Sequence, residues 1–133
     1  MLLIDREDRR KMVEGVGIWL NLQKSFQEKN NFKFWELPLE KRREMFIRAL
    51  FAAISELSEA GDEVNKWWKK GCKEASAIEE KREEILEELI DVMHFILLAF
   101  LILKASSEEI IDMYLKKLGI NFRRQEDKNL GYV

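Results

Sequence analysis

Nine consecutive apolar residues, Phe95 to Leu103, constrain the fold of this chain more than any other feature. They belong to the segment EELIDVMHFILLAFLILK (residues 87–104), which begins with three carboxylates in five positions. A helix that crosses a bilayer needs about 20 apolar residues, so this run is too short and has to be covered by protein. A helix that is apolar on nearly every side, in a chain of 133 residues, predicts association with a second copy, most simply as a two-fold homodimer.

The composition predicts a single all-α domain over residues 1–133. One proline and six glycines leave few breaks in the chain, and the abundant Glu, Lys, Leu, Ile and Ala favour helices. The net charge of -2 argues against a general nucleic-acid-binding protein, which needs a basic excess to neutralise phosphates. Cys72 is the one cysteine and the N-terminus does not resemble a signal peptide, so we expect a cytoplasmic protein without a membrane anchor.

We expect four helices with short links and a polar tail. The expected helices cover residues 5–29, 40–71, 76–104 and 106–119. The segment NNFKFWELP should end the first helix, and Gly71 and Gly119 stand where C-cap glycines belong. Ser76 with Glu79, and Ser106 with Glu109, have the spacing of a capping box and predict the two remaining helix starts.

Two pairs of carboxylates recur at helical spacing on the second and third expected helices. Glu56 and Glu59 are three residues apart, and Glu63 is seven from Glu56, so all three share one helical face. Glu88 and Asp91 repeat the spacing of three on the next helix. If the two helices pack together, both pairs can converge on one point.

Four converging carboxylates repel one another and shift their pKa values unless a cation neutralises them. Magnesium prefers carboxylate and water oxygens and commonly bridges to phosphates, so the pattern predicts Mg²⁺ and phosphate-ester or phosphoanhydride chemistry. A di-iron site usually needs two Glu-x-x-His pairs, whereas His94 is the one histidine here. The alternative that the acidic pairs are solvated surface charge stays open at this point.

These motifs resemble the all-α nucleoside triphosphate pyrophosphohydrolases of the MazG-like superfamily. The match is ELSE (residues 56–59) followed by ELID (residues 88–91). The stretches VNKWWKKG, EELIDVMHF and YLKKLGINFRRQEDKNLGY are similar to the dimeric, all-α dUTPase branch, and the similarity extends from about residue 18 to the end. The resemblance implies a MazG/dimeric-dUTPase-like bundle of four to five helices with a core completed by dimerisation.

The resemblance also implies the hydrolysis of dUTP to dUMP and pyrophosphate. The metal ligands carried over by position are Glu56, Glu59, Glu88 and Asp91, with Glu56 or Glu59 as the candidate general base. A C-terminal arm, residues 119–133, would close over the substrate. The implied contacts to the phosphates or the nucleoside are Lys69, Lys117, Asn121, Arg124 and Tyr132.

Base recognition is the least determined part of the resemblance. Gln23 is the best placed amide for reading the base, with Asn21 and Gln27 as alternates, and Trp68 or Trp67 is the expected stacking partner. Phe26 and Leu118 stand where amides are expected. The chain could therefore act on another nucleotide, such as dCTP or a modified triphosphate. A helical dimer that serves as a regulator or scaffold, without catalysis, is the third hypothesis.

Overall fold

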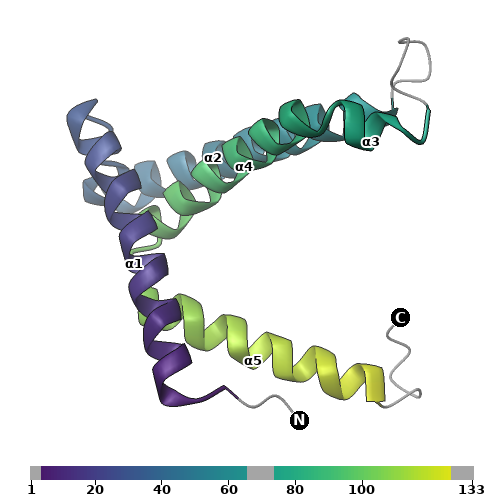
Figure 1. Cartoon of the computed structure of the whole chain (residues 1–133). Helices are drawn as coiled ribbons and strands as arrows, with labels where there is room; N and C mark the ends of the chain where they lie inside the picture. The colour runs from purple at the N-terminus through teal and green to yellow at the C-terminus, as the bar shows by residue number, and fades with distance from the viewer. Residues whose placement is uncertain (1–3, 66–73, 127–133) are drawn as a thin grey trace. The chain divides into compact units, whose positions relative to one another are not determined.

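The computed structural model describes residues 4–65 and 74–126, and every regular element within them is a helix (Figure 1). The elements are α1 (Arg6–Lys29), the 3-10 helix η1 (Phe34–Glu36), α2 (Leu39–Asn65), α3 (Ala77–Glu80), α4 (Arg82–Ile102) and α5 (Ser107–Glu126). The prediction of an all-α fold is confirmed. Several residues named above lie outside the described ranges: Trp67, Trp68, Lys69, Gly71, Cys72 and Tyr132.

The chain separates into two compact units. One contains Met1–Leu22 together with Ala105–Val133, and the other contains Gln23–Lys104. Helix α1 contributes residues to both. The prediction of one domain over residues 1–133 stays a prediction.

The first helix begins and ends with local signals that the sequence contains. Asp5 lies just before α1, and its Oδ1 accepts a hydrogen bond from the backbone N–H of Asp8 at 2.7 Å, as expected of an N-cap aspartate. Arg10 lies between Glu7 and Glu14 and pairs with both, which supports the first turns. Asn31 has a φ of 60° in the left-handed region, which favours chain reversal after the helix.

Helices α2 and α4 pack side by side and form the core of the second unit (Figure 1). The seam positions of α2 follow alternating steps of four and three, as in a helix-packing seam, and Ala49, Ala53 and Ala60, which lie four and seven residues apart along it, are all buried. On α4 the same spacing selects Phe95, Ala99 and Ile102. Ala49 packs with Leu98 and Ile102, and side chains of Phe34, Met45, Phe46 and Phe95 surround them.

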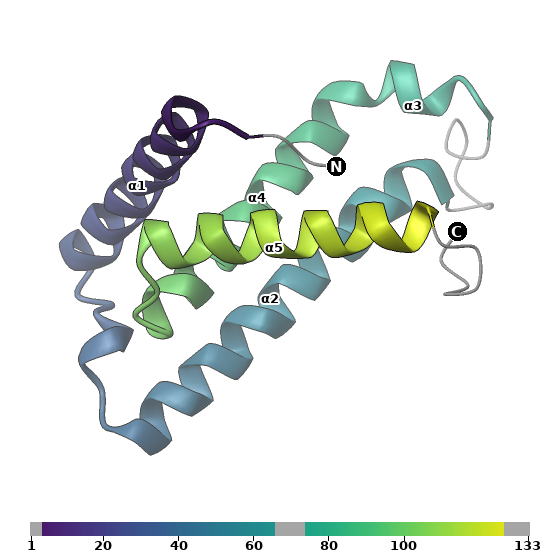
Figure 2. The ribbon, with the colours of Figure 1, turned by 90° about the horizontal axis from the view of Figure 1, so that it is seen from below.

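The third expected helix is interrupted at Lys81, which corrects the sequence prediction. Lys81 has φ −106° and ψ 19°, outside the helical region, so α3 ends before it and α4 begins after it (Figure 2). The predicted capping box at Ser76 is wrong as well. Ser76 already has helical angles and makes no side-chain capping bond. Ala77 is fully buried, so tertiary packing at this turn overrides the strong local helix preference of the sequence.

The last helix is longer than the sequence predicts. Its capping box forms as expected, because the Glu109 N–H donates to Ser106 Oγ at 3.1 Å and the Ser106 N–H donates to Glu109 Oε2 at 3.2 Å. The predicted end at Gly119 is wrong, since α5 continues to Glu126. One glycine costs a helix only about 1 kcal/mol, and the residues from Arg123 to Glu126 are good helix formers. Residues 119–126 of the expected arm are therefore helical.

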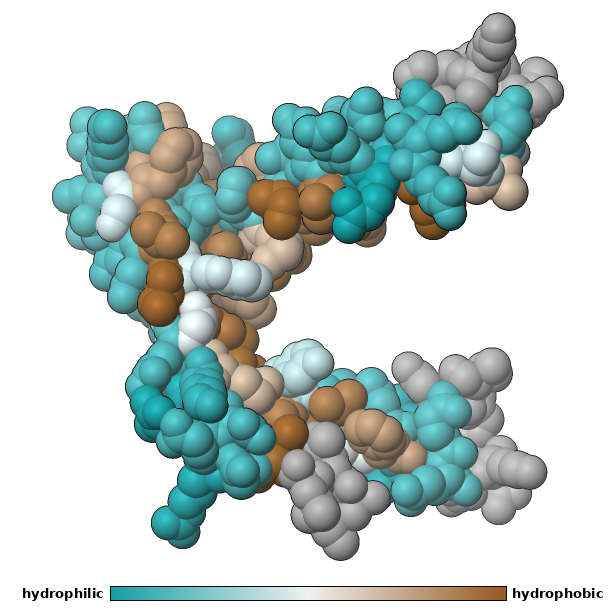
Figure 3. Space-filling model, in the orientation of Figure 1, coloured by the Kyte–Doolittle hydropathy of each residue, from teal (hydrophilic) through white to brown (hydrophobic). Residues whose placement is uncertain are grey.

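Large apolar side chains remain at the surface of the α2–α4 pair (Figure 3). On α2 they form a stripe at helical spacing, and on α4 they occur on several sides: Leu50, Phe51, Ile54, Leu57, Leu86, Leu89, Ile90 and Ile96. None of the described helices is long and apolar enough to span a membrane. The surface of this unit thus keeps the apolar character from which the sequence predicts a dimer.

Candidate metal centre

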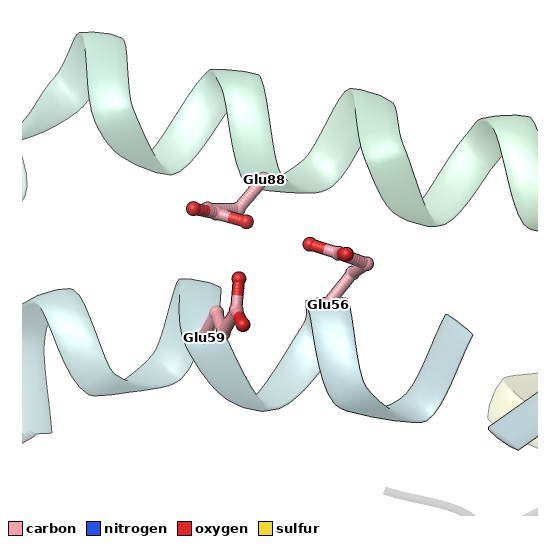
Figure 4. A group of neighbouring side chains, drawn as sticks. All are labelled: Glu56, Glu59 and Glu88. Atoms are coloured by element: carbon pink, nitrogen blue, oxygen red, sulfur yellow. The ribbon is translucent and has the colours of Figure 1, made fainter. Parts of the chain in front are cut away.

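Three carboxylates from α2 and α4 meet in the seam between these helices. Glu56 and Glu59 come from neighbouring turns of α2, Glu88 comes from α4, and all three point into the same gap (Figure 4). Each offers one carboxylate oxygen, and these oxygens all lie within 4.8 Å of one another. Glu56 and Glu88 are half-buried, whereas Glu59 is exposed. The predicted convergence of the acidic residues is present for these three.

The register of the two helices explains why these side chains meet. Glu56 lies between Ala53 and Ala60 in the four-three repeat of α2, so it occupies a position that faces α4. Glu88 lies seven residues before Phe95 and occupies the matching position on α4. Both carboxylates thus stand at seam positions that apolar residues occupy elsewhere in the same pair of helices.

Contact with the two glutamates of α2 raises the pKa of Glu88 from its ordinary value of 4.5 to about 7. The largest cause is hydrogen bonding to the Glu56 carboxylate, followed by partial burial. The hydrogen bond to Glu59 and the negative charge of Glu59 come next. Within residues 4–65 and 74–126, no cationic side chain pairs with any of the three carboxylates. Near neutral pH the Glu88 carboxyl is therefore partly protonated, because hydrogen bonding to Glu56 and Glu59 favours its protonated form.

A hard divalent cation fits this set of donors. Oxygen ligands are the ones that magnesium prefers, and a cation would replace the retained proton and relieve the repulsion. Asp91, the fourth predicted ligand, lies one turn beyond Glu88 on α4, is half-buried, and is outside the three-residue cluster. Its role as a ligand stays a prediction.

A family of known proteins matches the part of the chain that contains this centre. The family is described as dUTPase, and its sequence model matches residues 18–102. The chain belongs to the dUTPase-like, all-α family. The matched residues include both acidic motifs, so the resemblance stated above is confirmed. The all-helical architecture agrees with the family.

The chain is also similar to individual members with a stated activity. It is 35% identical over 90 residues to the dCTP pyrophosphatase of Enterobacteria phage T4, covering 61% of this chain and 53% of that protein. It is 34% identical over 88 residues to the dCTP pyrophosphatase of Enterobacteria phage LZ5, covering 59% and 51%. The chain thus spans about half the length of these relatives. No solved structure gives a significant match.

Gln23, the predicted base-reading amide of this dUTPase-like chain, belongs to the same unit as the acidic cluster. Its Nε2 donates to Gln27 Oε1 at 3.1 Å, and Gln27 Nε2 donates to the carbonyl oxygen of Phe32 at 3.2 Å. Gln27 is 4% exposed and holds its neighbour in this orientation. Gln27 is the alternate base-reading amide predicted from the sequence, but its buried amide bonds to Gln23 and to the Phe32 carbonyl oxygen instead. Phe26 is exposed.

The other predicted substrate contacts of the family are divided between described and undescribed parts of the chain. Lys117, Asn121 and Arg124 lie on α5, which belongs to the other compact unit. Lys117 and Arg124 are exposed and Asn121 is half-buried. Trp68, Lys69 and Tyr132 lie outside the described residues. The functions assigned to all six stay predictions.

One feature of the seam was missed at the level of sequence. Lys81, at the start of α4, pairs with Glu63 of α2, with Nζ and Oε2 3.8 Å apart. The sequence predicts only that Glu63 shares a helical face with Glu56. The signal that could have found the pair is the four-three repeat itself, since Lys81 is seven residues before Glu88 and Glu63 is seven residues after Glu56.

Proposed function

We propose that this chain is a magnesium-dependent pyrophosphohydrolase that converts dUTP and water to dUMP and pyrophosphate. The convergence of Glu56, Glu59 and Glu88, in a chain that the dUTPase family model matches over residues 18–102, carries the proposal. A cluster in which Glu88 takes up a proton near neutral pH, and with which none of the described cationic side chains pairs, is suited to bind a cation and, through it, a polyphosphate.

The four acidic residues would divide two tasks. Glu56, Glu59, Glu88 and Asp91 would hold Mg²⁺, which when bound neutralises phosphate charge and lowers the pKa of water. Glu56 or Glu59 would accept the proton of the attacking water, because a general base must lie within hydrogen-bond reach of the water it activates. Glu56 lies between the buried Ala53 and Ala60 along α2, on the face where its carboxylate meets that of Glu88.

The remaining predicted residues would bind the substrate. The proposed contacts to the phosphates or the nucleoside are Lys69 and four residues near the C-terminus: Lys117, Asn121, Arg124 and Tyr132. Gln23 would read the base edge and Trp68 would stack on the base. We further propose that the arm, residues 119–133, closes over the bound nucleotide.

The second candidate substrate is dCTP. The two phage relatives, at 35% and 34% identity, are both named dCTP pyrophosphatase. Uracil and cytosine differ at the exocyclic position, where one offers an acceptor oxygen and the other an amino donor. A single amide such as Gln23 carries both a donor and an acceptor, so it could read either base, and the orientation of the amide would set which base is preferred.

The protein is expected to work as a homodimer. The stripe of exposed apolar side chains on α2, Leu50, Phe51, Ile54 and Leu57, is compatible with burial against a second copy.

A substrate panel tests the proposal. The purified chain is incubated with each deoxynucleoside triphosphate, with and without Mg²⁺, and pyrophosphate and monophosphate are quantified separately from phosphate and diphosphate. We expect Mg²⁺-dependent release of pyrophosphate, fastest with dUTP. Faster turnover of dCTP selects the second candidate, whereas no turnover of any nucleotide favours the non-catalytic dimer.

A further inference from the structure

The seam between α2 and α4 contains a second charged position beyond the acidic cluster. Glu63 follows Glu56 by seven residues on α2, and Lys81 precedes Glu88 by seven residues on α4. The two helices run antiparallel, so equal steps in opposite directions along the chain keep the same register. The Glu63–Lys81 pair therefore lies two helical turns, about 10 Å, along the seam from the cluster.

The ammonium group of Lys81 is held near Glu63 without being fully satisfied by it. The distance of 3.8 Å makes an ion pair but is too long for a hydrogen bond. Both side chains are largely withdrawn from solvent, with exposed fractions of 26% for Lys81 and 21% for Glu63. A lysine has three N–H donors, and within the described part of the chain its Nζ makes no hydrogen bond.

The position of Lys81 is set by the backbone as well as by its charge. It occupies the turn that separates α3 from α4, yet its carbonyl oxygen accepts a hydrogen bond from the Ile85 N–H at 3.0 Å, so it is in register with the helix that follows. A flexible surface lysine loses rotamer freedom when it binds an anion. Lys81 is already confined beside α2, which reduces that cost.

We propose that Lys81 binds the terminal phosphate of the triphosphate substrate, with Glu63 as its counter-ion in the absence of substrate. The inference rests on the proposed function, because the inner phosphates are taken to lie at the acidic cluster. Among the described residues, Lys81 is the cation that a polyphosphate meets when it starts at the cluster and follows the seam toward the start of α4. The arrangement also assigns a direction: the leaving pyrophosphate points toward the start of α4, and the nucleoside points toward Asp91.

The charge pattern distinguishes this function from a purely structural ion pair. In a purely structural ion pair both residues stabilise the helix pair, so neutralising either residue should weaken the site and the binding of substrate. If Lys81 instead changes partner from Glu63 to phosphate, Glu63 competes with the substrate. Neutralising Glu63 should then strengthen substrate binding, and neutralising Lys81 should weaken it.

Two variants and a matched control test the inference in the full chain. Lys81→Gln and Glu63→Gln are compared with Lys41→Gln, which removes another loose lysine–glutamate pair, Lys41 with Glu44 at 3.7 Å on the exposed side of α2. KM and kcat are measured for the best nucleotide, and binding of inorganic tripolyphosphate is measured by calorimetry with Mg²⁺. We expect Lys81→Gln to raise KM and the tripolyphosphate Kd about tenfold. Glu63→Gln should lower both, and Lys41→Gln should change neither.

Two further measurements complete the test. Lys81→Arg should restore most of the tripolyphosphate affinity, because it restores the positive charge. Binding of Mn²⁺ without substrate should be unchanged or tighter in Lys81→Gln, whereas a variant that disturbs the seam would weaken it. Equal tripolyphosphate affinity in the wild type and Lys81→Gln, or weaker binding in both Lys81→Gln and Glu63→Gln, overturns the inference. Absence of hydrolysis by the wild type refutes the proposed function alone, because the calorimetric comparison still decides the role of Lys81.

Discussion

Glu88 of α4 and Glu56 of α2 face each other across the helix seam closely enough to interact through a proton. Their carboxylate oxygens belong to a group that lies within 4.8 Å, and the hydrogen bond to Glu56 is the largest cause of the raised pKa of Glu88. Two carboxylates so placed cannot both ionise without repulsion. The cation-free protein should therefore respond to pH in a way that a bound cation reverses.

The first prediction concerns the pH dependence of stability in the presence of a chelator. The pKa of Glu88 is about 7 in the folded protein and near 4.5 when the chain unfolds. Between these values the folded state binds more protons, so the contribution of Glu88 to the free energy of unfolding is lost as pH rises from about 4.5 through 7. Thermal unfolding at pH 5.5 and pH 8 should show this loss, and Glu88→Gln should remove it.

The stabilisation of the protein by magnesium should increase with pH, opposite to the trend without a cation. Because a cation displaces the proton from the cluster, the rise in Tm on adding Mg²⁺ should be larger at pH 8 than at pH 6. The Glu88→Gln variant should show little rise at either pH. A rise in the wild type that does not depend on pH would contradict the assignment of the cluster as the cation site.

The second prediction concerns the acidic residues themselves. Glu59→Gln and Asp91→Asn should each lower kcat by about 100-fold or more, because each removes a charge that holds the cation or activates water. Circular dichroism should show an unchanged helical content. Glu80→Gln, on the exposed surface of α3, provides a control that should keep full turnover. Wild-type turnover of Asp91→Asn would restrict the site to the three carboxylates that meet in the structure.

The fold could be predicted from the sequence where local signals and periodicity agree. Asp5 and Ser106 begin helices as expected, because each cap needs only residues within one turn. The convergence of Glu56 with Glu88 was also predictable, since helical spacing places each on one face and an apolar setting implies that the faces meet. These predictions depend on neighbours in sequence or on a single helix pair.

The predictions that failed depend on tertiary contacts or on small differences in propensity. Ser76 has the same capping pattern as Ser106, but its backbone is already helical and the chain bends at Lys81 instead. Gly119 resembles a helix end, yet the cost of one glycine is small beside the helix preference of the residues after it. The Glu63–Lys81 pair was not predicted, because it depends on the register between two helices, and the sequence of one helix does not determine that register.

The third prediction uses the two capping patterns as a matched pair. Ser106→Ala removes the acceptor of the Glu109 N–H and should lower the free energy of unfolding by about 1 kcal/mol. Ser76→Ala should change it little, because the Ser76 hydroxyl makes no capping bond. Urea denaturation of the two variants and the wild type measures both effects. Equal destabilisation by the two substitutions would contradict the difference between the two helix starts.

The fourth prediction concerns self-association. Ile54 lies in the middle of the exposed apolar stripe of α2 and is 59% exposed. If this stripe is covered by a second copy, Ile54→Glu should convert a dimer to a monomer, because burial of an unpaired charge is costly. Sedimentation velocity would measure the mass of both proteins. Glu40→Gln, at the polar start of α2, should leave the wild-type mass unchanged, and a monomeric wild type would refute the expectation.

The last prediction concerns the amide pair at the end of α1. Gln27 donates to the Phe32 carbonyl oxygen, so its own oxygen must accept, and Gln23 is then obliged to donate to it. Gln23 keeps its Oε1 and one N–H for another partner. If Gln23 reads the base, Gln23→Leu should bring the ratio of kcat/KM between dUTP and dCTP about tenfold closer to one, since a hydrogen bond to a base edge contributes about that much discrimination.

Gln27→Leu should change the same ratio in the same direction, because it releases the amide of Gln23. It should also lower the free energy of unfolding by about 1 kcal/mol, since the Phe32 carbonyl oxygen loses one of its two donors and keeps only the Phe34 N–H. Asn21→Leu, which alters an exposed amide two residues from Gln23, is the matched control and should leave the ratio unchanged. If the ratio of kcat/KM between dUTP and dCTP changes in Asn21→Leu but not in Gln23→Leu, Asn21 is the residue that reads the base.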